Sequence, residues 1–211
     1  MDRLVSPAFS PKALASIFSI EPQLGHNSSV SHILTDSRSL IQPEATLFFA
    51  IRTESGDGHQ YIGALYGAGV RSFVVERLTG EESTSYPEAN WYVVPSSITA
   101  LQQLARAHRE RFPQLQALGI TGSNGKTIVK ELLYQLLATR YTTVRSPRSY
   151  NSQIGVPLSV LSITEEDELG LFEAGISRTG EMVALEPVIR PKYGVFTSLG
   201  SAHQEGFSSL E

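Results

Sequence analysis

The stretch Gly119-Ile-Thr-Gly-Ser-Asn-Gly-Lys-Thr127 decides the fold of this chain. It follows a short apolar run, Leu115 to Ile120, which predicts a buried strand. Apolar residues at helical spacing follow it, namely Ile128, Val129, Leu132, Leu133, Leu136 and Leu137. Strand, glycine-rich turn, Lys-Thr and helix together indicate a phosphate-binding loop, because loop amides and a helix N-terminus face an anion. The match to G-x-x-x-x-G-K-[ST] is incomplete, since Ile120 replaces the first glycine, and a structural turn with a chance Lys-Thr is the alternative.

Composition describes an ordinary globular protein and excludes several classes. The 211 residues are 41% hydrophobic and 18% charged, enough for one large domain or two small ones. The formal charge of −4 gives no support for nucleic-acid binding. The absence of cysteine excludes disulfides and thiolate metal sites, and no apolar run is long enough to cross a membrane. We therefore expect a cytoplasmic protein without a nucleic-acid or membrane partner.

Alternating strand and helix patterns predict an α/β protein with two units, residues 1–96 and 97–211. In the first unit we expect helices at 11–20 and 61–69, a surface loop at 79–90, and strands at 30–34, 46–51, 72–76 and 91–94. In the second, Ser97 caps a helix at 98–112, a helix follows the glycine-rich loop, another spans 181–189, and strands lie at 115–120, 142–145, 170–176 and 193–199. The β–α order predicts a mainly parallel sheet with its ligand at the carboxyl ends of the strands. Because so few strands are present, we expect an incomplete ATPase domain from a longer protein.

Three side chains outside the loop are candidates for chemistry. Glu173 ends an apolar strand, where a carboxylate can hold Mg²⁺ directly or through water; a solvent-facing glutamate is the alternative. His203 follows the strand at 193–199, although a hydrogen-bonded loop histidine is commoner than a magnesium ligand. Asn151 precedes the turn at Pro157, so it either binds a polar ligand or stabilises that turn.

Two polar loops of the first unit, 35–38 and 52–59, follow successive strands, so they can converge on one edge of a sheet. The candidates there for a nucleotide or sugar ligand are Asp36, Ser37, Arg38, Asp57, Gly58 and His59. The alternative is that Asp36 and Arg38 merely pair with each other.

Six motifs, in this order, resemble the Mur ligase family. They are Thr35-Asp-Ser-Arg38, Leu47-Phe-Phe-Ala50 followed by Gly56-Asp-Gly-His59, Ile120-Thr-Gly-Ser-Asn-Gly-Lys-Thr127, Asn151-x-x-Ile-Gly-Val-Pro157, Phe172-Glu-Ala-Gly175 and Ala202-His-Gln-Glu-Gly-Phe207. The resemblance runs from about Leu34 to the last residue. Within the family it is strongest to the ligase that adds D-alanyl-D-alanine, including forms fused to an alanine racemase.

The resemblance implies an ATP-dependent amide-bond ligase of peptidoglycan precursor synthesis. The carboxylate of UDP-N-acetylmuramoyl-tripeptide would attack ATP, and D-alanyl-D-alanine would displace phosphate from the acyl phosphate. By similarity, the ATP-binding residues are Gly122, Ser123, Asn124, Gly125, Lys126 and Thr127. One Mg²⁺ would be bound by Thr127 and Glu173, a second with help from His203, and Asn151 would lie near the activated carboxylate. The first unit would bind the UDP-sugar end through Asp36, Ser37, Arg38, Asp57, Gly58 and His59.

Departures from the family pattern limit this expectation. No lysine follows His203 where the family has one that becomes carbamylated, and nothing here resembles the domain that binds the incoming dipeptide. We therefore expect the chain alone to be inactive. A folylpolyglutamate synthetase is disfavoured by the roughly 120 residues before the loop, and a tripeptide-forming Mur ligase by His203-Gln-Glu-Gly-Phe207. A nucleotide-regulated binding module without ligase chemistry stays open.

Overall fold

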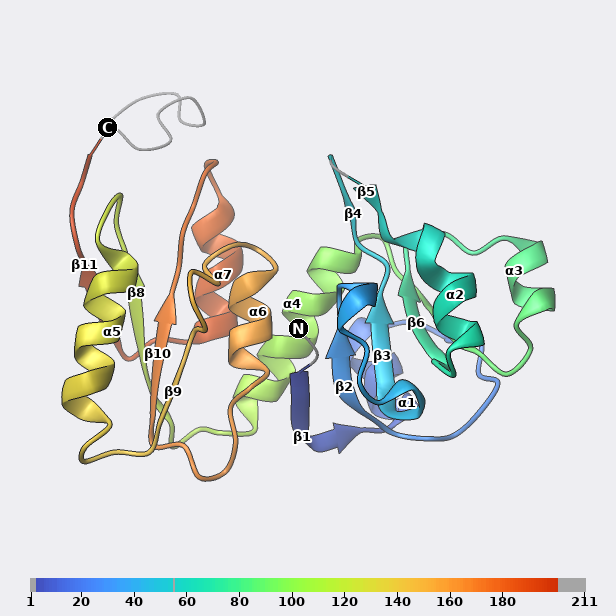
Figure 1. Ribbon diagram of the computed structural model, residues 1–211, viewed down its shortest axis with the longest axis horizontal. Helices are drawn as coiled ribbons and strands as arrows, with labels where there is room; N and C mark the ends of the chain where they lie inside the picture. The colour runs from blue at the N-terminus through green and yellow to red at the C-terminus, as the bar shows by residue number, and fades with distance from the viewer. Residues whose placement is uncertain (1–2, 55, 201–211) are drawn as a thin grey trace. The chain divides into compact units, whose positions relative to one another are not determined.

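The computed structural model describes residues 3–54 and 56–200 and confirms the α/β class (Figure 1). Two compact units are present, Met1–Leu104 and Ala105–Glu211. The boundary between them falls inside helix α4 (Ser97–Glu110), which starts close to the predicted division at residue 96. Ser96 rather than Ser97 acts at the start of this helix, because its hydroxyl accepts the Thr99 N–H at 3.3 Å.

The first unit contains a five-stranded sheet in the order β1-β2-β3-β6-β7. Its strands are β1 (Arg3–Phe9), β2 (Val30–Leu34), β3 (Thr46–Phe49), β6 (Ser72–Val75) and β7 (Asn90–Val93). The last four run parallel, whereas β1 pairs antiparallel with β2 at the edge. The sequence analysis missed β1, because Pro7 argues against a strand, yet an edge strand tolerates a proline.

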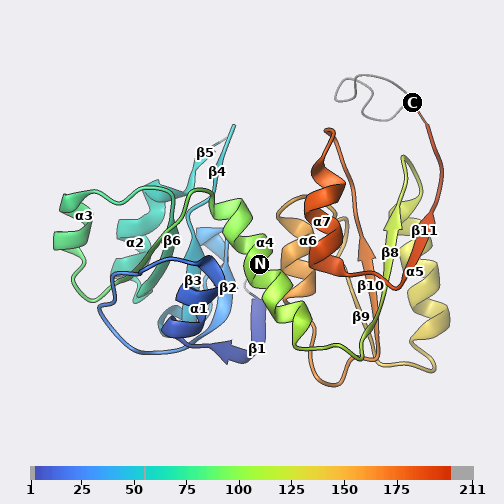
Figure 2. The same ribbon diagram turned by 180° about the vertical axis from the view of Figure 1, so that it is seen from behind.

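Aromatic residues alternate between the two faces of this sheet. Phe48, Phe73 and Trp91 are in register and form a core cluster with Ile62 and Leu65 of α2 (Ile62–Gly67). The next residues along β3 and β7 are Phe49 and Tyr92. Both contact the ring of Phe18, the last residue of α1 (Pro11–Phe18). The period of two along each strand therefore places one helix on each face, as Figures 1 and 2 show from opposite sides.

Residues 79–90, expected as a surface loop, contain helix α3 (Gly80–Ser85). Thr79 and Glu82 form a reciprocal capping box that starts this helix. Its six residues include no apolar side chain, so hydrophobic periodicity gives no signal there. The Thr-x-x-Glu spacing of a capping box was a signal that could have predicted this helix. Short elements fill the polar loops: 3₁₀ turns at Ser37–Ser39, Pro43–Ala45 and Gly58–Tyr61, and a hairpin of β4 (Arg52–Thr53) and β5 (Gly56–Asp57).

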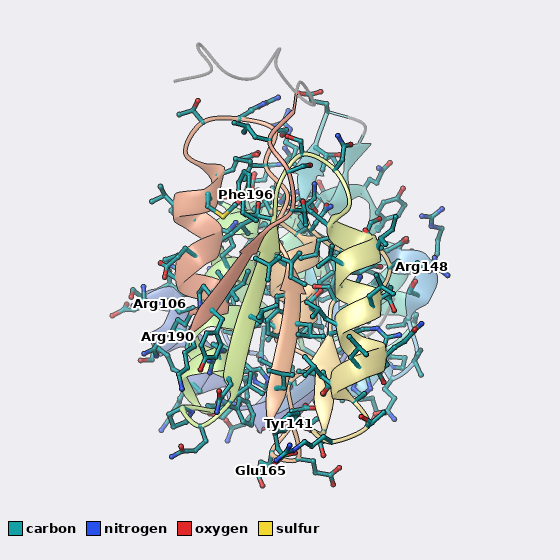
Figure 3. The ribbon with its side chains drawn as sticks, turned by 90° about the vertical axis from the view of Figure 1, so that its left-hand side faces the viewer. Arg106, Tyr141, Arg148, Glu165, Arg190 and Phe196 are labelled. Atoms are coloured by element: carbon teal, nitrogen blue, oxygen red, sulfur yellow. The ribbon has the colours of Figure 1, made fainter. Side chains whose placement is uncertain are left out.

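The second unit is a parallel sheet in the order β11-β8-β10-β9. Its strands are β8 (Gln116–Thr121), β9 (Thr143–Arg145), β10 (Leu169–Glu173) and β11 (Tyr193–Phe196). Helices α5 (Lys126–Leu137) and α7 (Glu181–Ile189) lie on opposite faces (Figure 3), and α6 (Gly155–Val160) packs against β10 and α7. Since β8 and β10 are parallel neighbours, the glycine-rich loop and Glu173 emerge at the same edge. Among the helices of the described residues, none has the length and apolar composition to cross a membrane.

Candidate functional site

The glycine-rich loop joins the end of β8 to the start of α5, as predicted. Gly122 and Gly125 have φ of +126° and +82°, in the left-handed half of the map that favours glycine. At Gly122 a Cβ would also overlap the Thr197 hydroxyl and lie 2.9 Å from the Ser198 backbone nitrogen. Backbone geometry therefore requires at least this glycine.

The start of α5 presents positive charge to the loop. Its first-turn N–H groups have no intrahelical acceptor, and no side chain caps this N-terminus in the described residues. Lys126 Nζ donates to the Gly122 carbonyl at 2.6 Å and lies 3.3 Å from the Ser123 carbonyl oxygen. An ammonium and a helix N-terminus at one loop form a site suited to phosphate.

Residues after β11 fasten the middle of the loop. The Ser123 N–H donates to the Ser198 carbonyl at 2.8 Å, and the Asn124 N–H donates to the Ser198 hydroxyl at 3.3 Å. The Thr197 hydroxyl donates to the Asn124 carbonyl at 2.6 Å. Ser123 and Asn124 therefore use these amides within the protein, and their contact with phosphate stays a prediction.

Glu173 brings the other predicted residues together. Its side chain is buried, at 1% exposure. The Thr127 hydroxyl donates to Oε2 and the Asn151 amide donates to Oε1, both at 2.8 Å. The Asn151 carbonyl also accepts the Gly175 N–H at 2.8 Å. Three residues separated by up to 46 positions in the sequence thus converge beside the loop.

The donor set at this point fits Mg²⁺. Thr127 and Glu173 offer hydroxyl and carboxylate oxygens, the ligand types that magnesium takes when phosphates and water complete its shell. Within residues 3–54 and 56–200, no group of three His, Cys, Asp or Glu side chains could hold a metal. The hydroxyl of Thr127 and the carboxylate of Glu173 could hold a magnesium ion that a phosphate also binds. His203, the third predicted ligand, lies outside the described residues.

Lys130 is a site residue that the sequence analysis missed. It is fully buried, its Nζ lies 3.6 Å from Glu173 Oε2 and 3.4 Å from Glu131 Oε1, and it donates to the Arg148 carbonyl. The apolar row Ile128, Leu132 and Leu136 is instead exposed, by 68%, 54% and 71%. The usable signal was the spacing from Lys126, since residues four apart share a helix face.

In the first unit, Asp36 and Arg38 pair with each other, the alternative named above. Arg38 Nε and Nη2 donate to the two carboxylate oxygens of Asp36 at 2.9 and 2.7 Å. These hydrogen bonds are the main cause that lowers the pKa of Asp36 to about 2. The Arg38 side chain is 86% exposed, so a ligand can still reach it. Ser37 lies between them in the 3₁₀ turn.

Asp57 and His59 form a second internal cluster. His59 Nε2 accepts the Glu76 N–H at 3.1 Å, so its Nδ1 carries the proton and donates to Asp57 Oδ1 at 2.6 Å. The His59 N–H also donates to Asp57, which is the largest cause lowering the pKa of Asp57 to about 2, and Arg77 donates to Oδ2 at 3.0 Å. His59 is buried and uses both ring nitrogens, so it holds the turn.

Gly58 allows the backbone of this turn to approach Ala50 and Ile51, which directly follow β3. A Cβ there would lie 2.8 Å from the Ile51 nitrogen and 2.9 Å from the Ala50 Cα. The Gly58 N–H donates to the Ile51 carbonyl at 2.9 Å. Whether any of these first-unit residues contacts a ligand stays a prediction.

A parallel sheet with a phosphate-binding loop at one strand end and a buried carboxylate at the next defines a P-loop nucleotide-binding domain. Residues 120–211 match the Mur ligase middle domain. The chain is 34% identical to UDP-N-acetylmuramoyl-tripeptide–D-alanyl-D-alanine ligase of Bacillus subtilis over 181 residues, and 36% identical to that of Treponema pallidum. These alignments cover 85% and 80% of this chain and 38% and 37% of the relatives.

Solved structures agree with the sequence matches. A crystal structure of MurF from Acinetobacter baumannii superposes with a TM-score of 0.86 at 26% identity, over 96% of this chain and 43% of that one. MurF ligase from Thermotoga maritima, in complex with ADP, gives 0.70 at 30% identity, over 81% and 38%. The second unit thus carries the middle domain of the Mur ligase family, and these relatives are of the MurF type. The chain spans about two fifths of their length.

Proposed function

We propose that this chain supplies the UDP-sugar-binding unit and part of the ATP-binding domain of a Mur-type ligase of peptidoglycan precursor synthesis. The ligase would add D-alanyl-D-alanine to UDP-N-acetylmuramoyl-tripeptide in the cytoplasm, with ATP and Mg²⁺. The convergence of Thr127, Asn151 and Glu173 beside Lys126 carries this proposal. The names of the relatives support the choice of substrates.

The reaction has two steps. An oxygen of the tripeptide carboxylate attacks the γ-phosphorus of ATP, the bond to the bridging oxygen breaks, and ADP leaves. The dipeptide amine then attacks the acyl carbon, phosphate leaves with the bonding electrons, and the nitrogen loses a proton. Such a transfer relies on positioning and charge neutralisation, so no protein nucleophile is required.

The residues of this chain would position the first step. Lys126 would exchange its loop carbonyls for the β- and γ-phosphate oxygens, and the α5 N-terminus would face the same charge. Bound Mg²⁺ would neutralise charge developing on the phosphates, held by Thr127 and Glu173. Asn151 donates one amide hydrogen to Glu173, which leaves its second for an oxygen of the substrate.

The first unit would bind the UDP end of the muramoyl substrate. Arg38 offers an exposed guanidinium for the diphosphate, in competition with Asp36. Asp57 keeps partial exposure beside Arg77 and could accept a hydrogen bond from uracil or ribose. D-alanyl-D-alanine would be bound by a part of the ligase that corresponds to none of the described residues.

Ligand binding and turnover by the 211-residue chain test this function together. We expect calorimetry to detect both MgADP and UDP-N-acetylmuramoyl-tripeptide. We expect phosphate release with ATP, the tripeptide substrate and D-alanyl-D-alanine to stay at background, because both reactants must be held in one geometry. Binding of neither ligand would contradict the proposal, and turnover that needs all three substrates would contradict the expectation of inactivity.

A further inference from the structure

Lys130 is a buried cation that the mechanism above does not use. Its ammonium is reached by three elements: α5, which carries it, the end of β10 with Glu173, and the segment after β9 that contains Arg148. Figure 3 shows Arg148 beside α5. Lys126, one helical turn earlier, points instead at the carbonyls of the phosphate-binding loop. The two lysines therefore face different neighbours.

The segment after β9 has a backbone that needs support. Arg148 adopts φ +49°, a left-handed conformation that non-glycine residues rarely take, and its carbonyl accepts from Lys130. Two tight turns follow, in which the Tyr150 N–H donates to Pro147 and the Asn151 N–H to Ser149. The bond from Lys130 thus fixes the turn that presents Asn151.

Lys130 also provides a positive charge close to the buried carboxylate of Glu173. Glu173 is 1% exposed, and its two hydrogen bonds come from the neutral donors Thr127 and Asn151. A buried carboxylate without a cation is costly, and Lys130 provides that cation at 3.6 Å. Positive and negative side chains alternate from Lys130 toward the surface, because Lys130 also lies near Glu131, and Glu131 pairs with Arg145 at 3.2 Å.

We propose that Lys130 is a positioning residue, which holds Glu173 and the Asn151 turn in one geometry. This assignment rests on the proposed function, because it concerns the same site. A merely structural ion pair would stabilise the second unit without controlling the Asn151–Glu173 contact, so that contact is the quantity to measure.

The first test is the side-chain amide resonance of Asn151 in the 211-residue chain, compared between wild type and Lys130→Met. We expect the variant to move or broaden this resonance, because the turn loses its anchor. Arg109→Met is the matched control, since Arg109 is also a buried cation but bonds to the carbonyls of Phe112, Leu115 and Ile189. It should destabilise the fold and leave the Asn151 resonance in place. An unchanged Asn151 resonance in folded Lys130→Met would overturn the proposal.

A wild-type measurement keeps the test decisive if Lys130→Met does not fold. The Lys130 ammonium should exchange with water much more slowly than that of Lys12 or Lys192, and a scalar coupling should join its nitrogen to the Arg148 carbonyl carbon. If the Lys130 ammonium exchanges as fast as those of the other two lysines and shows no coupling, its bond to the Arg148 carbonyl is absent and the proposal is wrong.

The chain contains no cysteine, which permits a chemical rescue. Lys130→Cys can be alkylated in denaturant with 2-bromoethylamine, which restores an ammonium at nearly the length of lysine, or with 1-bromopropane, which restores the length without charge. After refolding, only the aminoethyl form should recover the wild-type Asn151 resonance. Recovery by both forms would show that volume alone is needed and would overturn the role of the charge.

Nucleotide binding separates this proposal from the proposed function. Magnesium should strengthen ADP binding to wild type, and Lys130→Met should lose about 10-fold to 100-fold of that enhancement, as supporting residues of metal ligands do. Its affinity for ADP without magnesium should stay close to wild type. If wild type binds no MgADP, the proposed function fails, while the Asn151 resonance still decides the role of Lys130.

Discussion

The two units use the same kinds of side chains in opposite ways. In the first, the charged groups close on one another: Asp36 with Arg38, and Asp57 with His59 and Arg77. In the second, Glu173 is satisfied by Thr127, Asn151 and Lys130. Among the described residues, Lys126 bonds to loop carbonyls and the α5 N-terminus has no side-chain cap. To bind a ligand as proposed, the second unit would give up contacts of Lys126 with loop carbonyls, whereas the first would give up ion pairs.

The largest expected effect is on the rigid loop of the second unit. Gly122→Ala combines a φ of +126° with overlap at Thr197, and should lower the free energy of unfolding by about 3 kcal/mol or more. Gly125→Ala, with φ +82° and open space, should cost only about 1 kcal/mol. Urea unfolding of both variants measures the difference. Equal losses would show that the loop is not held by residues 197–198.

The next largest effect should come from acid, which should destabilise the two units in different pH ranges. Burial lowers the pKa of His108 from 6.5 to about 4, and its imidazole bonds to the Ile163 carbonyl in the second unit. The unfolded chain then binds more protons below pH 6.5, so stability falls from pH 6.5 to about 4, by on the order of 2–3 kcal/mol. The lowered pKa values of Asp36 and Asp57 act only between pH 3.8 and about 2, where their stabilisation is lost.

Urea unfolding at several pH values, with probes in each unit, checks this order. His108→Gln should flatten the slope between pH 6.5 and 4 for the second unit, because it removes the titrating group. If the slope persists in that variant, another group causes it and the assignment to His108 is wrong.

Removing Lys126 should affect binding more than stability. A charge-assisted phosphate contact contributes about 1.5–3 kcal/mol, so Lys126→Ala should lose roughly one to two decades of MgADP affinity. The fold should survive, because this ammonium bonds only to the loop among the described residues. Calorimetry at equal folded fraction compares the two proteins. Equal affinities would remove the phosphate-loop assignment.

The smallest stability effect should come from Arg38 in the first unit. Its ion pair with Asp36 is exposed, so Arg38→Lys should change the free energy of unfolding by less than about 1 kcal/mol. Affinity for UDP-N-acetylmuramic acid should fall nonetheless, since lysine cannot reproduce the bidentate contact. If the affinity is unchanged, Arg38 does not contact the ligand and only forms the ion pair with Asp36.

Local patterns predicted much of the fold and the centre of the candidate site. The strand–loop–helix at residues 115–137 and the placement of Glu173 at the neighbouring strand end follow from periodicity and the order of parallel strands. The brief helix α3 escaped prediction because it has no apolar face, and β1 because its proline is tolerated only at an edge.

The remaining errors concern tertiary contacts. The spacing of apolar residues in α5 marks two helix rows but not which row is covered, so Lys130 was missed and Leu132 was placed on the apolar face. The partners of His59 inside the protein, which are the side chain of Asp57 and the backbone of Glu76, were also not foreseen, and its expected contact with a ligand stays a prediction. No spacing in the sequence indicates the contact with Glu76, which is 17 residues away.

The central claim is that the two units bind different ligands. A backbone amide NMR titration of the 211-residue chain, with MgADP and UDP-N-acetylmuramic acid added separately, tests it most directly. MgADP should shift resonances of residues 122–130, 146–151 and 173–175. UDP-N-acetylmuramic acid should shift those of 35–38 and 52–59. Shifts by both ligands in the same loops, or none in the glycine-rich loop with MgADP, would contradict the account of two sites prepared in different ways.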